Sequence, residues 1–273
     1  MTPRIRSALA ASGLVPSEAR ALLAHVLQRD RGWLAAHAED VLSAAQARTF
    51  EALARRRHDG EPVAYLVGRR EFYGLELQIT PDVLIPRPET ELVVDLVLEH
   101  VDERNRARML DLGCGSGAIA LAVARQRPMC TVLGVDVSPA AVVLARSNAQ
   151  SLAIANAIFA ESDWFTQLRP GAFELIASNP PYVADDDVHL SEGDLRFEPA
   201  GALRGGIDGL AAIRTVVAGA SAFLAPGGWL LIEHGYDQAE SVRSLLVDAE
   251  FVGVESRRDL AGIQRVSMGR TAA

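Results

Sequence analysis

The chain has 273 residues, of which 49% are hydrophobic and 23% are charged. This composition is typical of a globular protein with a sizeable core, and it excludes a disordered or fibrous chain. The 27 basic and 35 acidic residues give a formal net charge of −8. An acidic chain is a poor ligand for a phosphate backbone, so no stable binding of nucleic acid is expected. The length predicts two domains, one of them small.

Cysteine and histidine usage narrows the chemistry and the compartment. Cys114 and Cys130 are too few for a disulfide framework, so we expect a cytoplasmic protein. The six histidines form no pair at metal-ligand spacing, and no metal is expected.

The uncharged run 215–232 approaches the length of a membrane span, but a Pro-Gly-Gly sequence at 226–228 interrupts it. It predicts a buried helix, a turn and a strand, and no membrane association.

The first part of the chain has the pattern of a small helical bundle. Residues 1 to about 60 are rich in Ala, Leu and Arg, and their apolar residues recur at helical spacing. Over residues 61–84, proline and glycine separate short apolar stretches, and this pattern indicates a hairpin or a linker. We place the domain boundary near residue 75, giving an N-terminal domain of residues 1–75 and a second domain of residues 76–273.

Strand-like and helical segments alternate in the second domain. The apolar runs that predict strands are Met109–Leu112, Thr131–Val135, Phe173–Ser178 and Trp229–Ile232. This alternation predicts parallel strands joined by right-handed crossovers, and therefore a doubly wound α/β sheet. The last two runs, Phe251–Val254 and Ile263–Met268, lie too close in sequence for a crossover helix, so they predict an antiparallel pair at the end of the sheet.

A glycine-rich loop follows the first of these strands and opens a helix. Gly113, Gly115 and Gly117 permit a tight turn and the close approach of a ligand to the backbone. The amino end of the helix supplies free N–H donors to the same ligand. The loop alone does not identify the ligand, because Gly113, Gly115 and Ala118 also satisfy the looser dinucleotide-binding pattern.

Three further side chains follow strands and are candidates for the same site. Asp136 ends the next strand, where a carboxylate can accept both hydroxyls of an unphosphorylated ribose. It could instead serve only the start of the next helix, at Ser138. A further strand is expected between Asp136 and residue 163, and after it Asp163 and Trp164 could take the amino group and the face of an adenine. For Trp164, filling of the core is the alternative.

The sequence Asn179-Pro180-Pro181-Tyr182 follows the strand Phe173–Ser178. The two prolines stiffen the loop, so that the Asn179 side-chain oxygen and the Pro180 carbonyl can point into a pocket as acceptors. Tyr182 can wall the pocket with its ring. Two acceptors suit a planar NH2 group conjugated to a carbonyl or a ring. A rigid surface turn is the alternative, and the position beside the glycine loop favours the pocket.

The glycine loop, Asp136 and the motif at 179–182 resemble the class I S-adenosylmethionine-dependent methyltransferases that act on planar amino groups. Within that class, the chain is similar over essentially its whole length to the release factor glutamine methyltransferases of the HemK/PrmC type. The segments that carry this finer resemblance are Glu61–Gly68, Ile85–Glu91, Asp163–Phe165, Phe197–Pro199, Leu203, Asp208–Leu210 and Glu233–Gly235.

The resemblance implies a mostly parallel seven-stranded sheet with a small helical domain that helps to dock the substrate. It implies methyl transfer from S-adenosylmethionine to the glutamine side-chain amide in the Gly-Gly-Gln motif of peptide chain release factors. The cofactor-binding residues that it implies are Gly113, Cys114, Gly115, Ser116, Gly117, Asp136, Asp163, Trp164 and Asn179. The substrate-binding residues are Asn179, Pro180, Pro181 and Tyr182, of which Asn179, Pro180 and Tyr182 are the catalytic ones.

Three other functions are weighed against this one. Adenine N6 or guanine N2 in a nucleic acid offers the same planar amino group, but such enzymes flip a base and grip phosphates. The net charge of −8 disfavours them, although the arginine run at 55–57 could form a local basic patch. The intact motif at 179–182 disfavours a noncatalytic cofactor-binding scaffold. A nicotinamide dehydrogenase would leave the two prolines unexplained.

Overall fold

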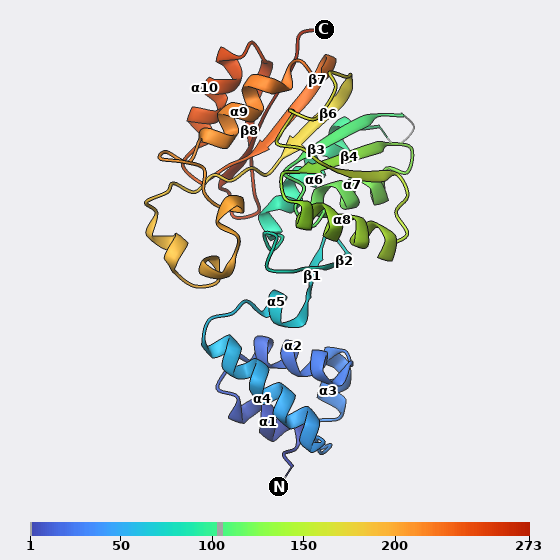
Figure 1. Ribbon diagram of the computed structural model, residues 1–273, viewed down its shortest axis with the longest axis vertical. Helices are drawn as coiled ribbons and strands as arrows, with labels where there is room; N and C mark the ends of the chain where they lie inside the picture. The colour runs from blue at the N-terminus through green and yellow to red at the C-terminus, as the bar shows by residue number, and fades with distance from the viewer. Residues whose placement is uncertain (1, 103–105) are drawn as a thin grey trace. The chain divides into compact units, whose positions relative to one another are not determined.

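The computed structural model describes residues 2–102 and 106–273, which form two compact units (Figure 1). The first unit consists of Met1–Arg69 together with Ser191–Phe197, and the second of Arg70–Leu190 together with Glu198–Ala273. The chain therefore leaves the first unit, returns to it for seven residues, and leaves it again. The boundary that we predicted near residue 75 lies a few residues beyond the first of these crossings.

The first unit is built from short helices around an apolar core. Its helices are α1 (Ile5–Ala11), α2 (Pro16–Leu27), α3 (Arg31–Ala36), α4 (Ala44–His58) and α5 (Val63–Val67). The longest helix, α4, begins with a capping box in which Ser43 and Gln46 satisfy each other's backbone N–H groups. The large buried side chains that hold the helices together include Ile5, Leu22, Leu23, Leu34, Phe50 and Leu66.

An arginine of α4 ties the returning segment to this unit. Arg57 pairs with Asp194 of the returning segment at 2.8 Å and with Glu18 of α2 at 2.8 Å. Because the Arg57 side chain is largely buried, these pairs are screened less by water than ordinary surface pairs. Residues 191–197 therefore belong to the helical unit although they follow the sheet strands in sequence.

The second unit contains a seven-stranded sheet with the order β5-β4-β3-β6-β7-β9-β8. Its strands are β3 (Arg108–Leu112), β4 (Thr131–Asp136), β5 (Ala157–Glu161), β6 (Phe173–Ser178), β7 (Leu224–Glu233), β8 (Val252–Arg258) and β9 (Gln264–Arg270). The strands β3 to β7 pair in parallel, and β9 pairs antiparallel with both β7 and β8. The predicted doubly wound, mostly parallel α/β fold is confirmed, with the predicted antiparallel pair at one end.

A small hairpin precedes the seven-stranded sheet in the chain. Helices cover both faces of the sheet. The hairpin pairs β1 (Arg69–Phe72) with β2 (Leu75–Gln78). The helices are α6 (Glu91–His100), α7 (Ala118–Gln126), α8 (Pro139–Ser151), α9 (Ala211–Ala220) and α10 (Ala239–Asp248).

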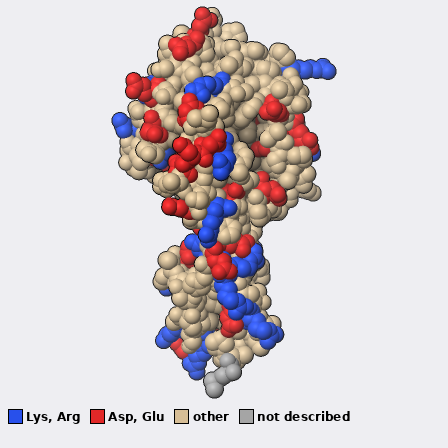
Figure 2. Space-filling view, turned by 60° about the vertical axis from the view of Figure 1, so that its left-hand side comes forward, with Lys and Arg blue, Asp and Glu red and all other residues tan. Residues whose placement is uncertain are grey.

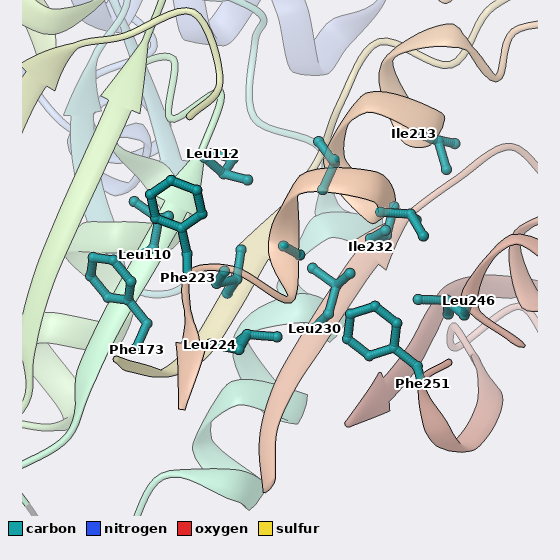
Figure 3. Packing of buried hydrophobic residues seen from close by; sticks show 14 of the residues in the cluster. Leu110, Leu112, Phe173, Ile213, Phe223, Leu224, Leu230, Ile232, Leu246 and Phe251 are labelled. Atoms are coloured by element: carbon teal, nitrogen blue, oxygen red, sulfur yellow. The ribbon is translucent and has the colours of Figure 1, made fainter. Parts of the chain in front are cut away.

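Along β3, Leu110 and Leu112 face the core cluster shared with α9 and α10, whereas Asp111 between them bonds to the start of α7. Figure 3 shows this cluster, in which the rings of Phe173, Phe223 and Phe251 lie among the leucines and isoleucines of the strands and of α9 and α10.

One predicted turn lies inside a strand. The Pro-Gly-Gly sequence at 226–228 was expected to separate a helix from a strand, but β7 begins at Leu224 and runs through it. The pairing with β6 is shifted there, since Phe173 pairs with Leu224 and Leu175 pairs with Trp229. The extra residues of β7 between these two pairs form an irregularity of the kind that a bulge produces, where glycine and proline are tolerated.

In the part of the chain that the structure describes, no helix is long and apolar enough to cross a membrane.

Candidate functional site

A cavity of about 560 Å³ opens at the carboxyl edge of the sheet, within the second unit. Ligands of α/β sheets bind at this edge, beyond the ends of the parallel strands. The residues that line the cavity come from the loops after β3, β4, β5 and β6, from the segment before α6, and from the segment 199–215. Those among our predicted site residues are Gly113, Cys114, Gly115, Ser116, Asp136, Asp163, Trp164, Asn179 and Pro181.

The glycine loop has the backbone that its sequence predicts. Gly113, Gly115 and Gly117 have φ values of 73°, 53° and 84°, in the left-handed region that favours glycine. The carbonyl of Val135 accepts hydrogen bonds from the N–H groups of Gly113 and Cys114, both at 2.9 Å, and this anchors the loop to β4. No heavy atom outside the adjoining chain lies within 4 Å of the point where a Cβ of Gly115 would stand. The space beside this residue is therefore open to a ligand.

Asp136 stands at the end of β4 and lines the cavity. Its two carboxylate oxygens accept hydrogen bonds from the N–H groups of Gly115 and Ser138, both at 2.9 Å. Asp136 therefore serves the start of the next helix, which was the alternative weighed for it, and it also holds the glycine loop. Each carboxylate oxygen keeps a further lone pair with which it can accept from a ligand.

The residues after β5 form another part of the lining, which includes Ser162, Asp163 and Trp164. Trp164 has a left-handed backbone with φ 49°, and its carbonyl accepts a hydrogen bond from the Ser162 hydroxyl at 2.7 Å. Its indole packs against the core cluster and also reaches the cavity beside Gly113. Filling of the core and contact with a ligand are thus both available to this side chain.

The motif at 179–182 divides between the cavity and the core. Asn179 and Pro181 line the cavity, whereas Pro180 is buried and is not among the lining residues. The Tyr182 ring, which we expected to wall the pocket, packs against the core cluster, and its burial raises the pKa of the phenol. The Tyr182 carbonyl accepts a hydrogen bond from Gln238 at 3.0 Å. Gly117 also lies outside the lining, because it starts α7 against Leu121 and Phe159.

Backbone pairing after the motif brings a distant segment to the cavity. The N–H of Val183 donates to the carbonyl of Leu203 at 2.9 Å, and the N–H of Gly205 donates to the carbonyl of Val183 at 2.8 Å. Gly205 packs so closely on the chain that a Cβ would come within 2.7 Å of the Pro181 carbonyl oxygen. Sequence reasoning missed this part of the lining because its residues carry little chemistry; they include Pro199, Gly201, Ala202, Ala211 and Ala212.

A buried carboxylate anchors the segment before α6. Glu198, which is 6% exposed, accepts a hydrogen bond from the N–H of Ile85 at 3.0 Å and forms an ion pair with Arg87. Arg87 and Thr90 both line the cavity. An arginine flanked by prolines is also an ordinary charge at the start of a helix, so the sequence around these two residues does not by itself decide their role. The geometry gives them a place in the site.

Two other carboxyl groups near the site are fully buried. Asp111 and Glu233 are each 1% exposed, and desolvation raises the pKa of each to about 7. In Asp111 one oxygen accepts a hydrogen bond from the N–H of Ala120 at 3.0 Å, which opposes the shift. Hydrogen bonds with Thr90 and Asn179 oppose it in Glu233. Sequence reasoning assigned neither residue a role.

The residues present fit a nucleoside-containing cofactor. The volume of the cavity lies in the range of small-molecule sites, and an acceptor, an indole and open backbone line it together. Residues 2–102 and 106–273 contain no group of three or more His, Cys, Asp or Glu residues that could hold a metal ion. The chemistry of the cavity is therefore built from hydrogen-bond acceptors, backbone N–H groups and aromatic surface.

Comparison with known structures shows the same fold. A methyltransferase from Pyrococcus furiosus aligns with a TM-score of 0.57 and 18% identity, over 80% of this chain and 98% of that one. A 16S rRNA N2 methyltransferase from T. thermophilus, in complex with AdoMet and guanosine, aligns with a TM-score of 0.54 and 23% identity, over 74% of this chain and 49% of that one. At these identities the likeness concerns the fold alone.

Comparison of sequences is more specific. The model of the family described as Methyltransferase small domain matches residues 90–201, and that of the PrmC N-terminal domain matches residues 4–68. A release factor glutamine methyltransferase of Burkholderia pseudomallei is 54% identical over 96% of this chain and 94% of its own length. Its counterpart in Escherichia coli is 45% identical over 97% and 95% of the two chains. The chain belongs to the release factor glutamine methyltransferase family.

Proposed function

We propose that the protein methylates the side-chain amide nitrogen of the glutamine in the Gly-Gly-Gln motif of peptide chain release factors, with S-adenosylmethionine as the methyl donor. The observation that carries this proposal is that Asn179 lines the same cavity as the glycine loop and Asp136. An acceptor for a planar NH2 group thus lies in the cavity that would hold the donor. Membership of the family supports this choice of substrate.

The cofactor would be held by the residues whose geometry suits its parts. S-adenosylmethionine supplies an electrophilic methyl group on a sulfonium centre. Asp136 would accept the ribose hydroxyls, and the open backbone at Gly113 and Gly115 would take the close approach of the ligand. Trp164 and Asp163 would contact the adenine, and Cys114 and Ser116 would complete the loop around it.

The chain's main contribution to the reaction would be to orient the glutamine amide. An amide nitrogen is a weak nucleophile because its lone pair is delocalised into the carbonyl group. The Asn179 side-chain oxygen, which lies in the cavity lining, would accept one of its hydrogens and stabilise the positive charge that develops on it; the Pro180 carbonyl, predicted as the second acceptor, belongs to a residue outside the lining. Holding reacting atoms in a near-attack arrangement is worth about 7–11 kcal/mol. Tyr182, whose ring is partly buried against the core cluster, would support the loop that carries Asn179.

The substrate also fixes the partner and the place of action in this proposal. The helical unit, which corresponds to the PrmC N-terminal domain, would help to dock the release factor. Because release factors act where peptide chains are terminated, the reaction would take place in the cytoplasm.

The experiment that tests the proposal offers three substrates to the protein. It is incubated with methyl-labelled S-adenosylmethionine and with a purified release factor, duplex DNA or ribosomal RNA, and the labelled atom is mapped by mass spectrometry. Label on the nitrogen of the Gly-Gly-Gln glutamine is the expected result. A release factor whose motif glutamine is replaced by alanine is the matched control and should stay unlabelled. Label on nucleic acid alone would overturn the proposal.

The nucleic-acid alternative finds no support in the charge distribution on the visible surface. On the face drawn in Figure 2, acidic and basic side chains lie interspersed, and the formal net charge is −8. Arg57, from the arginine run singled out in the sequence, pairs with Glu18 and Asp194. A phosphate backbone is best bound by unpaired cations. The protein substrate therefore remains the better choice.

Replacing Asp136 by alanine should weaken cofactor binding by about ten- to a hundredfold, since charge-assisted hydrogen bonds contribute roughly 1.5–3 kcal/mol each. The variant loses the bonds to the ribose and also the acceptor that holds Gly115. Isothermal calorimetry with S-adenosylmethionine measures the change. Asp163→Ala, which alters another acidic residue of the lining, should lose less affinity. Unchanged affinity in a folded Asp136→Ala variant would remove Asp136 from the cofactor site.

A further inference from the structure

A buried acidic side chain lies next to Asn179. Ser178, the last residue of β6, pairs with Ile232 of β7, so the residues that follow them, Asn179 and Glu233, lie at neighbouring positions at the edge of the sheet. Glu233 is 1% exposed, and among the described residues its Oε2 atom has no hydrogen-bond partner. Burial of a carboxyl group with an unsatisfied oxygen is costly. If this residue only packed against its neighbours, an apolar side chain at the same position would stabilise the fold better.

The hydrogen bonds around this carboxyl group have a direction. The amide Nδ2 of Asn179 donates to the hydroxyl of Thr90 at 3.1 Å, and the Thr90 hydroxyl in turn lowers the pKa of Glu233, as a hydroxyl does when its hydrogen is directed at a carboxylate. A hydroxyl has a single hydrogen. When that hydrogen is donated to an ionised carboxylate, which can only accept, the hydroxyl can only accept from its other neighbour. The neighbouring amide must then present its NH2 group to Thr90.

The opposite end of the same amide faces the site. Asn179 and Thr90 both line the cavity, whereas Glu233 does not. With Nδ2 held by Thr90, and with the Asn179 amide also lowering the pKa of Glu233, which only its NH2 group can do, the amide turns its Oδ1 atom away from these partners. A side-chain amide that turned over would instead offer hydrogens to the cavity. Two NH2 groups facing each other cannot form a hydrogen bond, so the orientation decides whether a glutamine amide can bind productively.

We propose that Glu233 is a positioning residue, which through the Thr90 hydroxyl fixes the Asn179 amide with its oxygen toward the substrate. The residue acts through Asn179 and does not itself contact the reacting atoms. The role rests on the proposed methylation of a glutamine amide, because only a substrate with hydrogens to donate requires an acceptor there. It assigns a function to a buried carboxyl group that the cofactor and substrate contacts leave unexplained.

The proposal makes the orientation sensitive to protonation of Glu233. A protonated carboxyl group can donate to Thr90, which frees the Thr90 hydrogen for the Asn179 oxygen and permits the amide to turn over. The charged groups that act on Glu233 are Arg265, which lowers its pKa, and Glu89, which raises it, and desolvation raises it to about 7 overall. Tyr182 is neutral, and burial lowers the pKa of the adjacent His234, so neither supplies a competing charge near neutral pH. Turnover should therefore rise as the pH increases through about 7.

Kinetics of Glu233→Gln test the proposal. The glutamine has nearly the same shape but can donate, so it resembles the protonated acid at every pH. We expect kcat at pH 8 to fall about ten- to a hundredfold, the size of effect produced by a mispaired buried amide, with little change in the affinity for S-adenosylmethionine. The rise of kcat between pH 6 and pH 8 should disappear. Thr90→Val, which removes the hydroxyl but keeps the shape, should lower kcat similarly, and Thr90→Ser should restore most of it.

The matched control is Glu255→Gln, an isosteric change at an exposed residue of β8, which should keep the wild-type rate and pH profile. A second measurement does not depend on activity. In protein with labelled asparagine side chains, the NH2 resonances of Asn179 should shift between pH 6 and pH 8 in the wild type and in Glu255→Gln, but not in Glu233→Gln.

The outcomes separate this proposal from the proposed function. If the wild type fails to methylate the release factor glutamine, the proposed function is wrong, while the resonance shifts still test the link between Glu233 and Asn179. If the wild type is active and Glu233→Gln keeps both its rate and its pH profile, the positioning role is wrong. A uniform loss of rate at every pH, with the profile retained, would show that Glu233 has a structural role only.

Discussion

Replacing Asn179 by alanine lowers turnover by about 10²- to 10³-fold, the loss that follows removal of one preorganised group that stabilises transition-state charge. The expected cause is the missing acceptor for the substrate amide, since the charge on that nitrogen grows only as the methyl group is transferred. The affinity for S-adenosylmethionine should change only by a small factor, because the loop after β3 and Asp136 remain intact. Single-turnover kinetics and calorimetry measure the two quantities.

Asn156→Ala is the matched control for this change. The Asn156 amide NH2 group lies within hydrogen-bond distance of the carbonyls of Ala124, Arg127 and Cys130 and shares its two hydrogens among them, before the start of β5 and outside the cavity lining. Asn156→Ala should therefore lower the free energy of unfolding without lowering the turnover of the folded protein. Near-normal turnover in a folded Asn179→Ala variant would contradict the role that we give to this residue, and with it the proposed arrangement of the amide.

The second large effect concerns stability and pH. In the folded protein burial raises the pKa of Asp111 from 3.8 to about 7, so the native state binds a proton that the unfolded chain has released. The stabilisation by this proton is complete at pH values below the pKa of Asp111 in the unfolded chain. It is lost as the pH rises through the pKa of Asp111 in the folded protein. Between pH 5 and pH 8 the free energy of unfolding should fall by about 3 kcal/mol on account of this group.

Urea unfolding of the cofactor-free protein at pH 5 and pH 8 measures this change. Asp111→Asn cannot ionise, so its free energy of unfolding should lose that part of the pH dependence, and the comparison with wild type removes the contributions of other groups. Asp186→Asn, a change in an exposed loop, should keep the wild-type dependence. Equal pH dependence in the wild type and in Asp111→Asn would show that Asp111 is ionised in the folded state.

The sequence was sufficient to predict the sheet because its signals are local. The predicted strand Phe173–Ser178 has the observed bounds of β6, and the run from Thr131 extends by one residue to Asp136. The predicted strands are apolar runs, and helices separate β3 from β4, β4 from β5, β6 from β7 and β7 from β8. The predicted start of β7 was wrong. Glycine and proline at 226–228 favour a turn locally, but pairing with β6 holds these residues in the sheet.

The site could be predicted only where its residues follow a strand directly. Asp136 and Asn179 were found in this way, since the carboxyl ends of neighbouring parallel strands meet at one edge. The contact of Asn179 with Thr90 spans 89 residues, and the bond of Glu198 to Ile85 spans 113. No spacing rule connects such positions. The small residues of the segment 199–215 left no chemical signal, although they form a large part of the lining.

The return of residues 191–197 to the helical unit bears on how the protein can be divided experimentally. A recombinant fragment that stops at residue 69 would lack Asp194 and so would expose one side of Arg57, which is a partner of that carboxylate in the whole chain. A protease that nicks the backbone after residue 69 would still leave seven residues of the larger fragment attached to the helical unit, held there by the ion pair between Asp194 and Arg57. The two pieces should then co-elute, and genetic truncation, rather than digestion, is the way to prepare the sheet unit alone.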